Sequence, residues 1–461
     1  MAKDISTVSS SFRDPSGFLF MYNKSLYRQV NKEYSSIYEK LMSSGLYAQL
    51  VKKGWLIRHE ETSDVPPANS ENAYKVIRPE MIHFISYPYE WSFSQLKDAS
   101  LLTLKIQKEA LEKDLILKDA SAYNIQFQNG KPTLIDTLSF DEYKEGKPWD
   151  AYRQFCQHFL APLALMSKVD VRLSQLMRVY IDGIPLDLAS KLLPWNTKLN
   201  LGLATHIHLH ANAQKKYSES QGKSASSASV SKMGLLGLID SLQGTVKGLD
   251  WSPKGTEWAE YYDITNYSSA SFDQKKNLVR DFVQVAGGGK IWDIGANTGE
   301  FSRAVMELGQ VVSFDIDPAA VEKNYRQVKT NKETGILPLL LDLTNPSAGI
   351  GWANSERDSI ETRGPANVIL ALALIHHICI SNNVPLENFA SYLSKLGDYL
   401  IIEFVPKEDS QVKILLSTRK DIFPHYSVEG FEKAFSNSFE IVKKQSVEGS
   451  VRVLYLLKAK K

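Results

Sequence analysis

The chain has 461 residues, enough for two or three domains of ordinary size. Its 54 basic and 52 acidic residues leave a formal charge of only +2, so no global field would draw the chain to nucleic acid or to an anionic membrane, and only a local patch stays open. The chain has two cysteines, its N-terminus lacks the apolar core of a signal peptide, and no apolar run approaches about eighteen residues. We therefore expect a cytoplasmic protein without disulfide bonds and without a membrane partner.

The first domain is expected over residues 11–213 as an α+β domain. Residues 18–22 and 26–30 have the composition of two strands joined by a tight turn. Residues 33–53 have the apolar spacing of a helix that Gly45 interrupts. A long helix is expected over residues 93–113, with Ser92 or Ser94 as its N-cap.

A pattern of polar residues follows this long helix. Asp119 and Asn124 have the spacing D-x-x-x-x-N, and Asp136 comes after an Asn-Gly turn at Asn129. The pattern is similar to the catalytic loop and metal-binding aspartate of protein kinase-like and aminoglycoside phosphotransferase-like folds. This resemblance implies that Asp119 would orient an acceptor hydroxyl, while Asn124 and Asp136 would hold magnesium for ATP.

The same domain departs from the kinase-like pattern in three places. Lys118 precedes Asp119 where a histidine or arginine is expected, no glycine-rich phosphate loop surrounds Gly17, and Arg28 stands where a strand would supply a lysine. Three interpretations stay open: a working phosphotransferase, a related fold that serves substrate recognition or regulation, and polar residues that merely cap a turn and end a strand.

Three histidines, His206, His208 and His210, alternate near the end of this domain. On a strand they would line one face and suggest a metal ion, whereas on a helix only the first and third would share a face. Since no carboxylate or cysteine nearby completes a site, we expect no bound metal.

Residues 214–232 are rich in serine and poor in apolar side chains. Such a segment cannot bury enough apolar surface to stay ordered, so we expect a flexible linker. The second domain is then expected over residues 233–461.

Residues 291–302, IWDIGANTGEFS, have the form of a nucleotide-binding strand, turn and helix. Gly295 and Gly299 allow the chain to turn sharply, and the helix that follows presents backbone amides to the turn. Asn297 replaces the glycine that a dinucleotide site needs, and Asp293 would repel a phosphate. A carboxylate there suits a ligand with an ammonium and a sulfonium group, which is S-adenosylmethionine.

Acidic residues end the next two expected strands. Asp315 lies twenty residues beyond Gly295, where a carboxylate can accept both hydroxyls of a ribose. Asp342 ends the third strand, in a position to meet the adenine. A fourth strand, over residues 368–375, is apolar throughout, as a strand buried on both faces should be, and it ends at His376 and His377.

Together these motifs resemble class I, Rossmann-like S-adenosylmethionine-dependent methyltransferases over residues 250–461. The resemblance implies an α/β fold with a seven-stranded sheet, one strand of which is antiparallel, with residues 439–443 and 451–457 as the last two strands. It also implies a cofactor site formed by Asp293, Gly295, Asn297, Gly299, Asp315 and Asp342. An inactive scaffold, or a nucleotide binder without chemistry, stays open as an alternative.

The expected function is methyl transfer to a small or medium-sized acceptor. His376 and His377 are the candidates for a base or a substrate contact, because ligands bind at the carboxyl edge of such sheets. Glu403 is a weaker candidate. We expect a small-molecule acceptor and leave a protein acceptor open. The alternatives are a regulatory protein that senses S-adenosylmethionine and a bifunctional protein with an N-terminal phosphotransferase-like domain.

Overall fold

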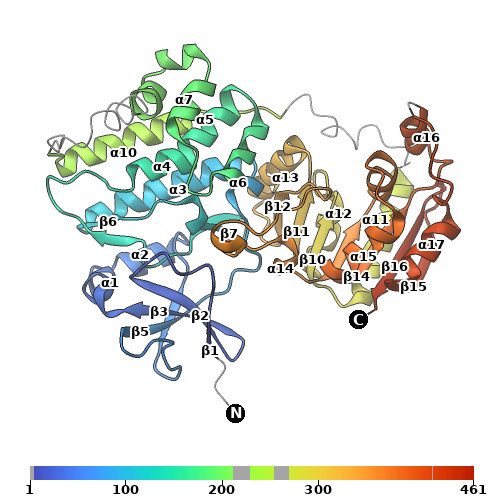
Figure 1. Ribbon diagram of the computed structural model, residues 1–461, viewed down its shortest axis with the longest axis horizontal. Coiled ribbons are helices and arrows are strands. Elements are labelled where there is room, and N and C mark those ends of the chain that lie inside the picture. The colour runs from blue at the N-terminus through green and yellow to red at the C-terminus, as the bar shows by residue number, and fades with distance from the viewer. Residues whose placement is uncertain (1–4, 211–228, 254–268, 418, 461) are drawn as a thin grey trace. The chain divides into compact units, whose positions relative to one another are not determined.

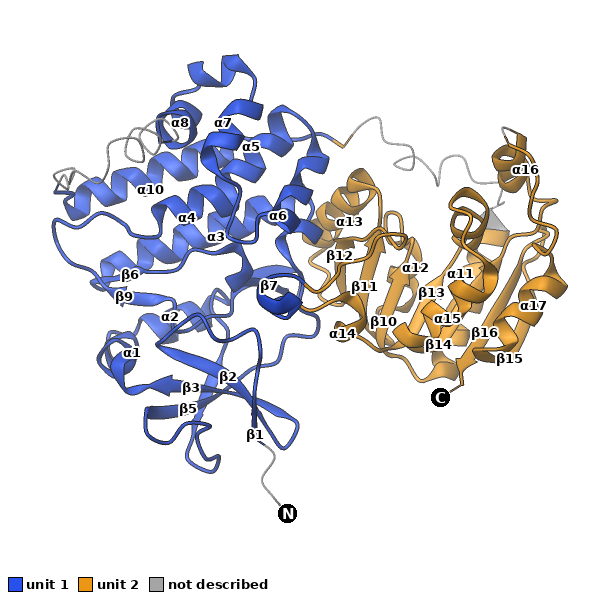
Figure 2. Cartoon of the chain, in the orientation of Figure 1, with its two compact units in different colours: residues 1–252, 350–357 blue, residues 253–349, 358–461 orange. Residues whose placement is uncertain are grey.

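The computed structural model describes residues 5–210, 229–253, 269–417 and 419–460 (Figure 1). The chain forms two compact units, coloured separately in Figure 2. Unit 1 comprises Met1–Ser252 together with the short segment Ile350–Arg357, and unit 2 comprises Pro253–Gly349 and Asp358–Lys461. Most of the expected linker at 214–232 lies outside the described residues.

Unit 1 begins with a five-stranded antiparallel sheet. Its strands, in spatial order, are β1 (Ile5–Thr7), β2 (Gly17–Tyr22), β3 (Ser25–Asn31), β5 (Ala73–Pro79) and β4 (His59–Thr62). The expected hairpin is confirmed. The helical stretch that follows is interrupted at Gly45, whose φ of 77° separates α1 (Ser35–Ser43) from α2 (Leu46–Lys52).

The rest of unit 1 is mainly helical. The expected long helix is confirmed as α3 (Phe93–Glu112), and the Ser92 hydroxyl caps it by accepting from the Gln95 amide. Two short ladders pair β6 (Leu115–Leu117) with β9 (Phe140–Glu142) and β7 (Ile125–Gln128) with β8 (Lys131–Leu134). The helices that follow are α4 (Tyr152–Phe155), η4 (Cys156–Leu160), α5 (Ala161–Lys168), η5 (Val171–Gln175), α6 (Leu176–Val179), α7 (Leu186–Leu192), η6 (Trp195–Leu199), α8 (Leu201–Leu203) and η7 (Ala204–Leu209).

Helix α10 (Lys232–Lys247) belongs to unit 1, so the units divide after Ser252 and not at residue 233. The helix buries one apolar face, formed by Leu235, Ile239, Leu242 and Val246. Lys108 of α3 pairs with Asp240 at 3.0 Å, and Lys97 binds the carbonyl of Leu249 at 2.6 Å. The apolar face and these contacts hold α10 against α3. The serine-rich sequence that precedes α10 gives no sign that this helix belongs to unit 1.

Unit 2 contains a seven-stranded sheet, as expected. Its strands, in spatial order, are β12 (Ile336–Leu340), β11 (Gly309–Asp315), β10 (Gly289–Ile294), β13 (Ala366–Ala371), β14 (Gly397–Phe404), β16 (Val453–Ala459) and β15 (Phe439–Ser446). The first five are parallel, and β16 is antiparallel to both of its neighbours. The expectation of one antiparallel strand is confirmed.

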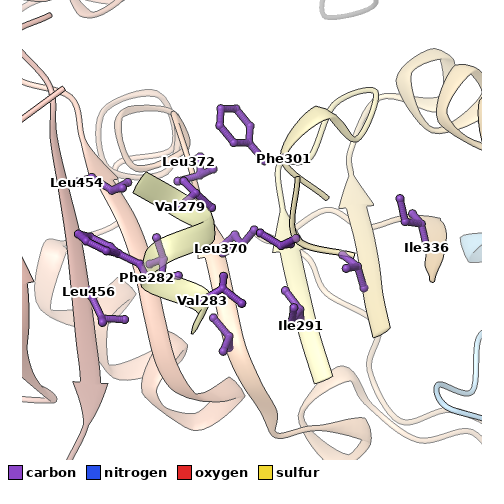
Figure 3. Close-up of a cluster of buried hydrophobic side chains, with 14 of the residues drawn as sticks. Val279, Phe282, Val283, Ile291, Phe301, Ile336, Leu370, Leu372, Leu454 and Leu456 are labelled. Carbon is purple, nitrogen blue, oxygen red and sulfur yellow. The ribbon is translucent and has the colours of Figure 1, made fainter. Parts of the chain in front are cut away.

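One hydrophobic cluster of unit 2, shown in Figure 3, lies between the sheet and the helices on one of its faces. Val279, Phe282 and Val283 of α11 (Ser269–Ala286) meet Leu370 and Leu456 of the sheet. The remaining helices of unit 2 are α12 (Glu300–Val305), α13 (Pro318–Asn331), α14 (Ile360–Arg363), η10 (His377–Ser381), α15 (Leu386–Leu396), α16 (Ser410–Ser417) and α17 (Val428–Ser436). Because the central strands are covered, their ligand-binding groups are confined to the strand ends.

In the described part of the chain, no helix is both long and apolar enough to cross a bilayer.

Candidate functional site

A cavity of about 430 Å³ opens at the carboxyl edge of the parallel strands in unit 2. Its wall combines the ends of β10 and β11 and the residues that follow β13 with residues of α11, η10 and α16. Among the residues expected to bind a cofactor, those that line the cavity are Asp293, Gly295, Asn297, Asp315 and Asp342. Residues spread over fifty positions of sequence are therefore brought into one site.

The turn between β10 and α12 has a left-handed backbone at three positions, with φ of 79° at Gly295, 50° at Asn297 and 82° at Gly299. Gly299 is not among the residues that line the cavity. A Cβ on Gly299 would lie 2.6 Å from the side chain of Asn324, so this glycine is needed for the turn and for its packing. Asn297 tolerates its conformation because its own side-chain oxygen accepts from the Thr298 amide at 2.8 Å.

Asp293 is buried, yet it lines the cavity. The hydroxyl of Ser302, on α12, donates to its carboxylate at 2.6 Å and lies 2.7 Å from the Ser313 hydroxyl of β11. Burial, together with the nearby charge of Asp315, raises the pKa of Asp293 to about 7. A cation in the cavity would favour the charged form of this carboxylate.

Asp315 ties the end of β11 to the glycine turn. Its two carboxylate oxygens accept from the backbone amides of Asn297 at 2.7 Å and Asp317 at 2.8 Å. Burial raises the pKa of Asp315 to about 6. Each carboxylate oxygen can accept a further hydrogen bond, so the group can still receive two hydroxyls.

Asp342 lies beyond the end of β12 and is half-buried. One of its oxygens accepts from the amide of Thr344 at 2.8 Å and from the hydroxyl of the same residue at 2.6 Å. This local turn fixes the carboxylate at the rim of the cavity, next to Leu341 and Leu343.

The two histidines after β13 differ in position. His377 lines the cavity, whereas His376 is fully buried and is not among the lining residues. Burial lowers the pKa of His377 to about 4, and burial and the neighbouring His377 lower that of His376 well below its usual range. Both rings are therefore neutral near pH 7. Of the two candidates, only His377 is placed to meet an acceptor.

A buried group of charges that the sequence analysis largely missed completes the cavity wall. Lys275 of α11 binds Glu403 of β14 at 2.7 Å, and Arg452 binds Asp409 at 2.7 Å while standing 3.8 Å from Glu403. Lys275 and Arg452 both line the cavity. The sequence contains one sign that Lys275 is buried. It lies at helical spacing from Phe272, Val279 and Phe282, on the apolar face of α11.

Glu403 also fixes the backbone at the end of β13. Its Oε2 accepts from the amide of Ala373 at 2.8 Å, and Ala373 has the left-handed φ of 49° that is uncommon for a residue with a Cβ. The carboxylate thus contributes to the cavity through Ala373 and is a positioning residue.

The three polar residues expected to form a nucleotide site in unit 1, Asp119, Asn124 and Asp136, also lie close together. The Asn124 side chain hydrogen-bonds to Asp119, and the charge of Asp136 acts on the pKa of Asp119. Burial, with a smaller effect of Asp136, raises the pKa of Asp119. Burial would raise that of Asp136 as well, but the ion pair with Arg28 turns the net shift downward. Asp119 also accepts from Gln154 at 2.8 Å. The arrangement brings these residues together, but it sets a protein cation on the aspartate expected to hold magnesium.

Two of the alternating histidines, His206 and His208, form hydrogen bonds within unit 1. His206 contacts the hydroxyls of Tyr152 at 2.8 Å and Ser241 at 2.9 Å, and His208 contacts those of Ser190 at 2.7 Å and Thr197 at 2.9 Å. Within the described ranges, no group of three histidine, cysteine or acidic side chains is arranged to hold a metal ion.

No protein-family model matches the sequence. Solved structures similar to part of the chain include two methyltransferases. N-methyltransferase NodS from Bradyrhizobium japonicum WM9 is 10% identical, covers 42% of this chain and 99% of its own, and gives a TM-score of 0.31. Magnesium protoporphyrin IX methyltransferase from Synechocystis PCC 6803, with bound SAH, is 17% identical. It covers 44% of this chain and 93% of its own, with a TM-score of 0.31.

A curated protein matches almost the whole length. Nodulation protein NoeA of Rhizobium meliloti (strain 1021) is 35% identical over 459 residues, which is 97% of this chain and 95% of that protein. The similarity extends through both units and is not confined to the part that contains the cavity. The chain therefore belongs to the family of the nodulation protein NoeA.

Proposed function

We propose that unit 2 binds S-adenosylmethionine and transfers its methyl group to a small or medium-sized acceptor. The observation that carries this proposal is the convergence of Asp293, Asp315 and Asp342 on one cavity around the left-handed turn at Gly295. Three carboxylates at one site favour a ligand with a positive charge and several hydrogen-bond donors, and they oppose a phosphate.

Each carboxylate suits a different part of that ligand. Asp293, buried and with a raised pKa, suits the ammonium group, which would restore its charge. Asp315, with both oxygens held by amides of the turn, suits the two ribose hydroxyls. Asp342, Leu343 and the exposed Ile316 suit the edge and faces of the adenine. When bound, the cofactor supplies a methyl group on a sulfonium, which is already an activated leaving group.

The chain's own contribution to the reaction would then be alignment of the acceptor. His377 is the candidate contact, since it lines the cavity after β13. With a pKa of about 4 it is a weak base near pH 7, and this favours an acceptor that attacks through a free lone pair. A small molecule fits a cavity of this volume, and a side chain of a protein substrate stays an alternative.

Calorimetry on the full chain tests the cofactor assignment. The parent should bind S-adenosylmethionine, and Asp315→Ala should bind at least about tenfold more weakly, because a charge-assisted hydrogen bond is worth roughly 1.5 kcal/mol or more. Asp281→Ala, an exposed aspartate of α11 outside the cavity, is the matched control and should leave the affinity unchanged. Absence of binding at millimolar ligand would remove the proposal.

A measurement of methyl transfer distinguishes an enzyme from the alternative function, a regulatory protein that only senses the cofactor. Native mass spectrometry of the purified protein identifies retained ligand, and a labelled-methyl assay over candidate acceptors then tests transfer. Tight binding with no transfer to any acceptor class would favour the sensor.

A nucleotide site in unit 1 is a second candidate, favoured by the clustering of Asp119, Asn124 and Asp136. Such a site would make the protein bifunctional, with ATP and magnesium bound in unit 1. The Arg28 guanidinium on Asp136 would have to move before a magnesium ion could bind there, so weak affinity is expected. Mg-ATP should raise the melting temperature of the parent, and Asp136→Asn should abolish the shift. No shift at millimolar nucleotide would leave unit 1 as a recognition or regulatory domain.

A further inference from the structure

Unit 1 exposes an unusual group of large apolar side chains within residues 192–201, which we call the apolar corner. Its members are Leu192, Trp195, Leu199 and Leu201, with exposed fractions of 42%, 74%, 77% and 83%. They lie at the end of α7, on η6 and at the start of α8, at one edge of unit 1 in Figure 2. Single exposed apolar residues are ordinary on protein surfaces, but four within ten residues of sequence, one of them a tryptophan, indicate an interaction site.

Buried hydrogen bonds beneath the apolar corner hold it in place. The Thr197 hydroxyl, buried inside η6, donates to the Pro194 carbonyl at 2.6 Å, so at 2.9 Å it must accept from Nε2 of His208. Nδ1 of the same ring, carrying no proton, then accepts from the Ser190 hydroxyl of α7 at 2.7 Å. One neutral imidazole thus joins η7, η6 and α7. These hydrogen bonds hold together the three helical segments around the apolar corner.

The charged residues within positions 187–201 are Lys191, Lys198 and Asp187, which give a formal charge of +1. Residues 188–210 contain Lys191 and Lys198, both exposed, and no aspartate or glutamate. Lys191 lies 3.8 Å from Asp187, but both side chains are more than half exposed, so the solvent screens this pair. Lys198 also contributes to the lowered pKa of the buried His208, after burial itself.

Tryptophan, leucine and lysine together match the interface of an anionic bilayer. Tryptophan rings favour the headgroup level, leucines enter the boundary of the acyl chains, and lysines meet the lipid phosphates. A second copy of this chain fits less well, because a two-fold contact through the apolar corner would bring its lysines together. We propose that the apolar corner docks the protein on an anionic membrane surface.

The small number of inserted side chains sets the strength of this contact. Stable anchoring needs more apolar surface or a second signal, so docking by one corner is reversible. Because the lysines contribute through charge, binding weakens as salt rises from about 0.1 M to about 0.5 M. This site is separate from the cavity of unit 2 and does not depend on methyl transfer.

Flotation of the full chain with lipid vesicles tests the proposal. The parent should float with vesicles of equal parts phosphatidylcholine and phosphatidylglycerol, and much less with phosphatidylcholine alone. The double variant Trp195→Ser, Leu199→Ser should lose at least about tenfold in apparent affinity. Both side chains are exposed, so the fold is expected to survive, which circular dichroism verifies.

Trp352→Ser provides the matched control, since Trp352 also lies in unit 1 and is 73% exposed. This variant should bind vesicles as the parent does. Equal losses in the control and the double variant would overturn the proposal, and so would a parent that fails to float with anionic vesicles. Analytical ultracentrifugation gives the remaining outcome: a parent dimer that the double variant converts to monomers would assign the apolar corner to self-association and reject the membrane.

Discussion

Arg13 and Glu356 stand 343 residues apart in the sequence and form a two-point ion pair inside unit 1. Nη2 of the arginine lies 3.0 Å from Oε2 of the glutamate, and Nε contacts Oε1. Glu356 is buried and also accepts from the Trp352 amide at 2.7 Å. The next residue, Arg357, places its guanidinium 4.3 Å from the centre of the Tyr123 ring. Adjacent charged residues thus fix the segment Ile350–Arg357 in unit 1.

We predict that Glu356→Ala loosens this segment. The substitution removes both contacts with Arg13 and leaves the Trp352 amide without its carboxylate, at an expected cost of about 1 to 3 kcal/mol. Hydrogen exchange of peptides that cover residues 350–357 should therefore accelerate, and the denaturation midpoint of unit 1 should fall.

Asp182→Ala supplies the control on the same arginine. Asp182 is 81% exposed and lies 3.7 Å from Arg13, so its loss should change stability by less than about 0.5 kcal/mol. Equal effects of the two variants would mean that the buried contact with Glu356 does not hold the segment.

The sequence predicted the sheet of unit 2 well, because its signals are local. Apolar runs identify the buried strands, and the residues at their ends, Asp315 and Asp342, must then share one edge of a parallel sheet. The left-handed turn at Gly295 and Gly299 follows from the same reasoning, since few other residues accept such φ values.

Features that depend on distant residues could not be predicted this way. The pairing of Lys275 with Glu403 joins residues 128 positions apart, and Arg452 comes from the far end of the chain. Neighbouring residues also differ: His376 and His377 are adjacent, and only the packing of η10 decides which one reaches the cavity. The insertion of Ile350–Arg357 into unit 1 has no local signal at all.

The pKa of about 7 at Asp293 predicts opposite pH effects with and without the cofactor. A carboxyl whose folded pKa lies above its unfolded value of 3.8 stabilises the ligand-free fold at low pH, and this contribution is lost as pH rises toward 7. The charged form, however, is the one that attracts an ammonium group. Affinity for S-adenosylmethionine should therefore rise with pH, by up to about tenfold per unit below pH 7.

Calorimetry across about pH 6 to pH 8 measures this dependence, and thermal denaturation of the ligand-free protein measures the opposite trend. Asp293→Asn should bind more weakly and lose most of the pH dependence. If the variant keeps the parent's pH profile, another group is responsible for it.

Proteolysis within residues 214–232 is predicted to cut the chain without releasing two separate particles. The serine-rich sequence has little to bury, so it should be cleaved first. Helix α10, however, begins at Lys232 and buries its apolar face within unit 1. The nicked protein should therefore elute as one particle in size-exclusion chromatography and separate only in denaturant. Replacing Leu235 and Leu242 by serine should weaken this association, so that the fragments part at a lower denaturant concentration, since the segment Ile350–Arg357 still contacts unit 1. A nicked parent that separates without denaturant would contradict the assignment of α10 to unit 1.

The ion pair of Lys275 and Glu403 is predicted to be costly to break from one side. Both side chains are at most 3% exposed, so Lys275→Met leaves a buried carboxylate without its lysine, although Arg452, at 3.8 Å, and the Ala373 amide still contact it. The expected loss in unfolding free energy is about 3 to 5 kcal/mol.

Arg280→Met breaks a pair of similar length on the surface, between Arg280 and Glu307, and should cost less than about 1 kcal/mol. Adding Glu403→Gln to Lys275→Met should recover part of the loss, since the uncompensated charge is gone. Chemical denaturation of five proteins gives the values: the parent, Lys275→Met, Glu403→Gln, the double variant and Arg280→Met. A double variant as unstable as the sum of its single changes would show that the two residues do not act as a pair.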